Sequence, residues 1–261
     1  MKNNRIIWGL VALVVLTTIA ISLGTTSSHS QQETSKKQDN KQNDTGFRDL
    51  SKYAVLDYDA PEPDNAVERE KRILKNKRYD KQGLVVKNPH PDDGGVSVED
   101  EIPPPPIIPA AESDLIVIGE IVNASAHLSN DKSGIYTEFT IRVDETLKSD
   151  TANKVEQDDS ITADRTGGVV RYPNGQKVFY RNDGDDLPRV GSKYVLFLTS
   201  DKQSPNYKIL NGQELKDDGV IPLDLERSFD AFKGARKMSF IKAVRDKIAE
   251  SSTGEGLRRK P

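Results

Sequence analysis

A strict alternation of side-chain types between residues 135 and 144 constrains the fold of this chain more than any other feature of its sequence. One set of positions holds Ile135, Thr137, Phe139, Ile141 and Val143, and the positions between them hold Tyr136, Glu138, Thr140, Arg142 and Asp144. Successive side chains of a β-strand point to opposite faces of the sheet, so the pattern predicts one face in the core and one in water. Such a strand is typical of an antiparallel sheet with one solvated face.

Short apolar runs separated by turn residues extend this pattern over residues 112–223. The runs predict further strands near 115–122, 160–166, 169–172, 177–180, 194–198, 206–210 and 220–223. Gly119 inside the first run predicts a bulge, Gly167-Gly168 predicts a break, and Pro173-Asn174-Gly175-Gln176 predicts a hairpin turn. Short strands without a helical period between them predict a mainly β chain with a small antiparallel barrel or sandwich.

Four stretches of this region carry a resemblance to a known group of proteins. They are Ser113 to Val122, Glu138 to Lys148, Gly167-Gly168 and Val190 to Leu198. Their order resembles that of uncharacterised bacterial exported or membrane-anchored proteins with an OB-like or netrin-like β-barrel. The resemblance implies the barrel and assigns no functional residue. Tissue inhibitors of metalloproteinases share this barrel type but depend on an N-terminal cysteine, and this chain contains no cysteine.

Residues 6–24 contain no charged side chain, whereas Lys2 and Arg5 precede them. Nineteen residues of helix rise about 28 Å, close to the hydrocarbon thickness of a bilayer. The run therefore predicts a transmembrane signal-anchor helix, with residues 1–5 in the cytoplasm and the remaining chain outside, in the periplasm or at the cell surface. The lipid bilayer is the partner of this helix. The alternative is a signal peptide that is cleaved, which would leave a secreted protein.

Residues 25–111 are polar and contain many prolines, which predicts a long disordered arm. Two places in the arm differ. The charged stretch 65–78, with Asp64 as its cap, predicts a short helix. The segment 47–60 carries a small apolar cluster and forms either a disordered patch or a segment that docks on the β domain.

The segment after the β domain, residues 224–250, is expected to be a loop followed by a helix capped by Ser239. Phe240, Ile241, Val244 and Ile248 fall on one face of that helix and predict that it covers one barrel opening or sheet face. The alternative is a helix that binds a partner. Residues 251–261 are polar and are expected to be a disordered tail.

The composition excludes several kinds of chemistry. Without cysteine there is no disulfide, thiolate metal site or cysteine nucleophile. His29, His90 and His127 do not have the spacing of a zinc site, and Asp183, Asp185 and Asp186 lack that of a calcium loop. The 38 basic and 41 acidic residues are interspersed, which does not favour a nucleic-acid partner. The sequence therefore predicts no catalytic residue, no metal ligand and no cofactor.

Several tyrosines and arginines on the predicted outer face of the barrel form a candidate ligand surface. They are Tyr136, Arg142, Arg171, Tyr172, Tyr180 and Arg181. The alternative is a set of cross-strand pairs on a solvated sheet. The function that fits best is a non-catalytic, membrane-tethered extracytoplasmic binding or structural module, with an envelope protein or polymer as partner. The alternative is an envelope hydrolase that uses loop carboxylates near Asp144 and Asp183.

Overall fold

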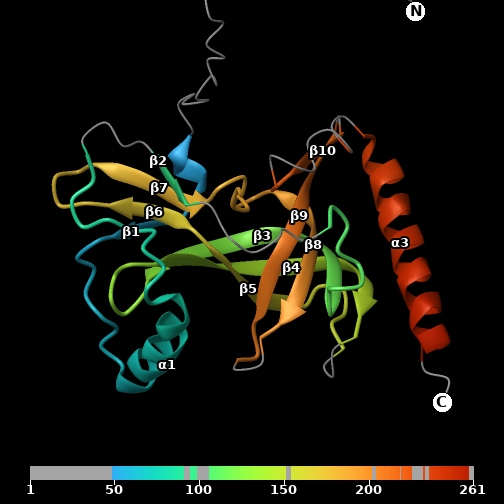
Figure 1. Ribbon diagram of the computed structural model, residues 1–261, viewed down its shortest axis with the longest axis horizontal. Helices are drawn as coiled ribbons and strands as arrows, with labels where there is room; N and C mark the ends of the chain where they lie inside the picture. Colours follow the sequence, from blue (N-terminus) through green and yellow to red (C-terminus); the bar gives the residue numbers. More distant parts are fainter. Residues whose placement is uncertain are drawn as a thin grey trace, which may run out of the picture. The chain divides into compact units, whose positions relative to one another are not determined.

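The computed structural model describes residues 49–90, 95–98, 106–150, 154–201, 204–217, 219–224, 232 and 235–258. The chain is mainly β and ends in a helix, as the strand pattern predicts (Figure 1). No helix in the described ranges is long and apolar enough to cross a membrane. The predicted transmembrane helix over 6–24, residues 1–5 and residues 25–48 lie outside those ranges.

The elements follow one another in a simple order. A 3-10 turn, η1 (Leu50–Lys52), and β1 (Val55–Asp57) precede α1 (Ala66–Asn76), a second 3-10 turn, η2 (Lys77–Tyr79), and β2 (Gly95–Val98). The remaining strands are β3 (Leu115–Leu128), β4 (Ile135–Ser149), β5 (Ser160–Thr166), β6 (Gly168–Arg171), β7 (Lys177–Asn182), β8 (Lys193–Ser200), β9 (Tyr207–Lys216) and β10 (Gly219–Pro222), and α3 (Lys237–Arg258) ends the described chain.

Five strands pair in a closed circuit, in the order β3, β4, β5, β9, β8 and back to β3. The β5–β9 pair is parallel, and the other pairs of the circuit are antiparallel. A sharp irregularity between Ile118 and Gly119 confirms the predicted bulge. A side chain at Gly119 would approach the carbonyl oxygen of Arg142 to 2.7 Å, so the bend depends on glycine.

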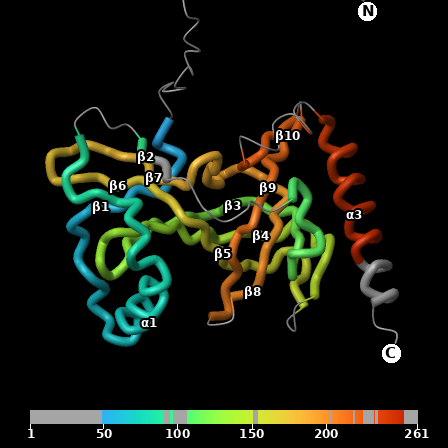
Figure 2. The backbone as a smooth tube through the Cα atoms, in the orientation of Figure 1, coloured from blue at the N-terminus to red at the C-terminus, as the bar shows by residue number. Residues whose placement is uncertain are grey.

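The first half of β3, residues 115–121, and most of β8 are buried on both faces, which explains why these stretches are mainly apolar. Leu115, Val117, Leu196 and Leu198 point into the circuit, and their neighbours Ile116, Ile118, Val195 and Phe197 lie under α3. From α3, Phe240, Ile241 and Val244 complete this outer layer. Figure 2 shows α3 running beside β9 and β10. The predicted cover by the C-terminal helix is therefore correct.

A second, four-stranded sheet has the order β1-β6-β7-β2. Its centre is the β6–β7 hairpin, which confirms the turn predicted at 173–176. Gly167, at φ +114°, connects β5 to β6 and directs the chain from one sheet into the other. β1 and β2 join the hairpin in parallel, one on each side.

The prediction of a disordered arm over 25–111 is wrong for residues 49–90. Leu50 and Tyr53 pack against the barrel core, while Leu84 and Val85 are buried with the second sheet. Of the two interpretations of segment 47–60, the described part, 49–60, is docked. These apolar residues are few and widely spaced in a polar sequence, so they produce no period that would indicate a packed segment.

The C-terminal helix is longer than expected. It begins at Lys237, so Ser239 lies within it rather than at its cap, and it continues to Arg258 through most of the segment predicted as a disordered tail. Extending an existing helix adds a hydrogen bond with each residue, which favours continuation even through a polar sequence.

Candidate functional site

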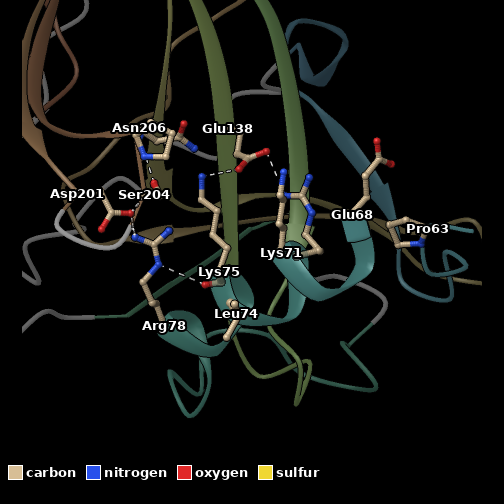
Figure 3. Close-up of a pocket in the computed structure, with 12 residues that line it drawn as sticks. Pro63, Glu68, Lys71, Leu74, Lys75, Arg78, Glu138, Asp201, Ser204 and Asn206 are labelled. Atoms are coloured by element: carbon tan, nitrogen blue, oxygen red, sulfur yellow. Dashed lines mark hydrogen bonds and ion pairs between the residues drawn. The ribbon is translucent and has the colours of Figure 1, made fainter. Parts of the chain in front are cut away.

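A cleft of about 700 Å³ lies between α1 and the loop that joins β8 to β9 (Figure 3). Its lining comes from α1 and η2, from Glu138 of β4, and from the β8–β9 loop. The lining residues are Pro63, Glu68, Lys71, Arg72, Leu74, Lys75, Arg78, Glu138, Asp201, Ser204, Pro205 and Asn206. Charged groups of both signs therefore face one another across the cleft.

Helix α1 presents a polar stripe to the barrel. Arg72, Lys75, Asn76 and Tyr79 are spaced by three or four residues, which places them on one side of the continuous α1–η2 helix. The helix begins at Asn65, whose side chain accepts hydrogen bonds from the backbone amides of Val67 at 2.9 Å and Glu68 at 3.2 Å. The cap is therefore Asn65 and not Asp64, one residue later than predicted.

Glu138 is the centre of the charged cluster under α1. Its Oε1 pairs with the Nζ of Lys75 (Figure 3). Its Oε2 lies 3.1 Å from Arg72 Nη1 and 3.2 Å from His127 Nε2. Burial raises the pKa of Glu138, but hydrogen bonds from His127 and Lys75 and the charges of Lys75 and Arg72 lower it further, so its pKa lies far below the ordinary value. Glu138 therefore remains ionised at any physiological pH.

Asp164 of β5 is a second carboxylate in this cluster, and its side chain is completely buried. Lys75 Nζ lies 3.1 Å from Asp164 Oδ1 and so bridges the two acids. Tyr79 donates its hydroxyl to Asp164 Oδ2. Burial and the adjacent charge of Asp164 raise the pKa of Tyr79, so this hydroxyl keeps its proton and remains a donor.

Tyr136 departs from the alternation that predicts β4. Its position belongs to the outer face, as expected, yet its side chain is fully buried because Tyr79 stacks on its ring at a centroid distance of 4.1 Å. Its hydroxyl accepts from Arg72 at 3.1 Å and donates to Asn76 at 2.7 Å. Burial raises the pKa of Tyr136 to about 12. The α1–η2 segment thus converts part of a solvated face into an interior.

His127 is held in the same cluster from β3. Burial lowers its pKa, although the hydrogen bond to Glu138 opposes the shift. The ring also lies against Tyr136 at a centroid distance of 5.3 Å. A neutral imidazole beside an ionised carboxylate is thus the expected state at neutral pH.

The other members of the predicted ligand surface do not gather with Tyr136. Tyr172 and Tyr180 are buried and share a hydrogen bond of 2.6 Å, so the prediction that they face outward is wrong. The packing of Leu84, Val85 and Tyr58 on the second sheet covers them. Of the predicted arginines, Arg142 pairs with Glu120, Arg171 pairs with Asp57 of β1, and Arg181 donates to the carbonyl of Asp185 at 2.7 Å. The alternative of cross-strand and inter-segment pairs describes these arginines better.

The hydrolase hypothesis names carboxylates near Asp144 and Asp183. Asp183 itself is exposed, while Asp144 and Asp185 each lie in an ion pair. Asp144 lies 2.7 Å from Lys193, and Asp185 lies 2.6 Å from Arg165. Arg165, the ion-pair partner of Asp185, lies opposite Thr137 of β4 in the strand pairing. Thr137 is seven residues before Asp144 on that strand, so the two ion pairs are attached about 23 Å apart along β4. Within the described ranges no three His, Cys, Asp or Glu residues gather to hold a metal ion.

No protein-family model matches this chain, and a search of curated proteins returned no match. Sequence reasoning missed Arg72, Lys75 and Asp164. The spacing of Arg72, Lys75 and Tyr79 by three and four residues was the one available signal, because it places two cations and an aromatic ring together on one face of the predicted helix.

Proposed function

We propose that this chain is a non-catalytic binding module whose ligand occupies the cleft between α1 and the β8–β9 loop. Residues 6–24 hold it at the outer face of the cytoplasmic membrane. Its partner is an envelope protein or polymer.

An OB-like barrel is the form of β domain that this proposal assumes, and the order of strand pairing supports it. In OB folds, ligands bind across the second and third strands and the loop between the fourth and fifth. In the circuit that begins at β3, those elements are β4, β5 and the β8–β9 loop. The cleft is lined by Glu138 of β4 and, from that loop, by Asp201, Ser204, Pro205 and Asn206.

The state of the carboxylates is the observation that carries the non-catalytic role. A general acid must hold a proton near neutral pH, and a general base needs a pKa near the working pH. Glu138 has a pKa far below that range and is held by Lys75 and Arg72. Asp201, on the opposite wall, pairs with Arg78 and accepts from Ser204 at 2.9 Å. Acids fixed in this manner are suited to shaping a binding surface.

The cleft also offers groups that fit an extended chain. Leu74 is 65% exposed and, with Pro63 and Pro205, supplies apolar surface, while Ser204 and Asn206 supply neutral polar groups. Apolar walls with a few polar groups that fix orientation are typical of ligand sites.

Site-specific photo-crosslinking tests the cleft directly. A photoreactive residue at Leu74 in the full chain, expressed in its native host, should yield a defined envelope adduct. The matched control is Val190, which is 42% exposed and does not line the cleft. The same adducts from both positions, or none from Leu74, would contradict the proposal.

The membrane tether needs a separate experiment. Alkaline phosphatase fused after Pro261 should be active and should remain with the membrane fraction through residues 6–24. Activity of a cytosolic reporter at this position, with an inactive phosphatase, would disprove the proposed orientation. A soluble, shortened product in the medium would instead favour cleavage of the first segment.

A further inference from the structure

The contact between α1 and the barrel is almost wholly polar. No residue of α1 is buried, and its three large apolar side chains remain exposed: Val67, Ile73 and Leu74 are 60%, 46% and 65% exposed. The barrel-facing contacts are those of Arg72, Lys75 and Asn76 with Glu138, Asp164 and Tyr136. Asn130 adds a hydrogen bond to the carbonyl of Ile73 at 3.0 Å. A helix that removes so little apolar surface from water is held mainly by its ion pairs.

The chain directly after α1 is attached in a different way. Tyr79 is 5% exposed and stacks on Tyr136, and Leu84 and Val85 are buried against the second sheet. Thus α1 can leave the barrel while η2 remains in place. The connection between Asn76 and Tyr79 is the natural hinge.

The groups beneath α1 form a ready-made site for a cation. Lys75 Nζ lies between Glu138 and Asp164, and Arg72 bridges Glu138 and the hydroxyl of Tyr136. One ammonium and one guanidinium group therefore already occupy hydrogen-bonding positions on two carboxylates and a phenol. Buried carboxylates left without a counter-charge are strongly unfavourable, so α1 can be exchanged only for another positively charged group. A neutral polymer does not meet this requirement.

We propose that α1 is an internal occupant of an anionic site on β4 and β5, and that the site's external ligand is a basic peptide segment of a partner protein, which displaces α1. This inference rests on the proposed binding function. It adds the class of ligand, and it extends the ligand's position from the cleft to the surface of β4 and β5 that α1 covers. In the displaced state, lysine or arginine side chains of the partner take the positions of Lys75 and Arg72 beside Glu138. The released α1 then carries its exposed apolar side chains with it.

A pair of double variants tests this inference. Arg72→Ala/Lys75→Ala removes the internal cations, whereas Lys87→Ala/Lys177→Ala removes the same charge from two exposed lysines that do not line the cleft and form no ion pair with a described residue. The probe is a fluorescent hexa-arginine peptide, with hexa-glutamate as its counterpart, and the readout is fluorescence anisotropy. The apparent affinity is the intrinsic affinity multiplied by the fraction of molecules in which α1 is displaced. The first variant should raise that fraction and therefore bind hexa-arginine about tenfold more tightly than wild type. The lysine control should match wild type.

Two further measurements keep the result interpretable. Hydrogen exchange should show loss of protection in residues 66–76 of the first variant and unchanged protection in β3, β4 and β8. Adding Glu138→Gln to that variant should abolish the gain in affinity. The inference is overturned if α1 is released and the affinity for hexa-arginine does not rise. It is also overturned if the affinity of the lysine control rises equally, or if hexa-glutamate binds with the same affinity as hexa-arginine. Photo-crosslinking at Leu74 tests the cleft without requiring α1 to move. A specific adduct at Leu74 together with a negative result for hexa-arginine would therefore reject only the cationic ligand.

Discussion

Helices α1 and α3 pack against the same barrel by opposite means. Helix α3 buries Phe240, Ile241 and Val244 completely or almost so against the outer face of β3 and β8. Helix α1 buries no side chain and uses Arg72 and Lys75 to reach the barrel. A buried large apolar side chain contributes about 1.5–3 kcal/mol. The ion pairs of α1 are largely buried, so the cost of desolvating their charges offsets much of their attraction. The comparison distinguishes a helix held by apolar burial from a helix held by ion pairs.

The largest effect is expected from the apolar helix. Phe240→Ala should lower the free energy of unfolding by about 3–5 kcal/mol, because it leaves a cavity between α3 and the sheet. Urea titration of the full chain measures the change. Met238→Ala, at a side chain that is 68% exposed, is the matched control and should shift stability by less than about 0.5 kcal/mol. Similar values for the two variants would mean that α3 is not part of the core.

A smaller and more local effect is expected at the polar helix. Glu138→Gln should weaken the attachment of α1 by about 2 kcal/mol, because Lys75 and Arg72 lose their charged acceptor. Faster hydrogen exchange over residues 66–76, with α3 unchanged, is the expected observation. Glu68→Gln, at an exposed residue of the same helix, should leave exchange as it is. Equal acceleration in both helices would remove the distinction between them.

The contribution of Glu138 should depend on pH. Its pKa is lowered in the folded state, so the unfolded chain binds the proton more readily and stability falls as the pH drops. The stabilisation is complete well above the unfolded pKa of about 4.3 and is lost as the pH falls below it. The difference in unfolding free energy between wild type and Glu138→Gln should therefore shrink from about 2 kcal/mol at pH 7 toward zero in strong acid. A difference that is constant over this range would show that the charge does not hold α1.

Salt provides the mildest test of the comparison. Raising ionic strength to about 1 M shortens the screening length to about 3 Å and should weaken the attachment of α1 by about 0.5 kcal/mol. Hydrogen exchange of α3 should be unaffected or slower, since apolar contacts are not screened. Acceleration confined to α3 would reverse the assignment.

The sequence alone predicted those strands, turns and helices whose apolar or turn residues follow a regular local pattern. The alternation over 135–144, the turn at 173–176 and the apolar face of α3 each predicted what the structure contains. The position of α1 has no such origin. Its ion pairs join residues about sixty positions or more apart, such as Lys75 with Glu138 and Asp164, and charged residues on a polar helix are normally solvated.

The buried tyrosines also show that the sequence pattern of one strand does not reveal which distant segments will cover it. Tyr136 and Tyr180 stand at positions that a single sheet would expose, and separate segments of the chain cover them. β1 and β2 are short strands of three and four residues that pair in parallel with distant partners. A short run of this kind does not differ from a coil in its sequence, and only the tertiary pairing makes it a strand.

Those two short strands have a consequence for α1. They fasten the chain on both sides of α1 to the same β6–β7 hairpin, so α1 after release can diffuse only within a closed loop. A group retained in this way rebinds as if it were present at about millimolar concentration. A single cationic side chain at low concentration would therefore not displace α1 from the anionic site. An array of them on a repeated or crowded partner would displace α1, so such a module would respond to the local density of its target.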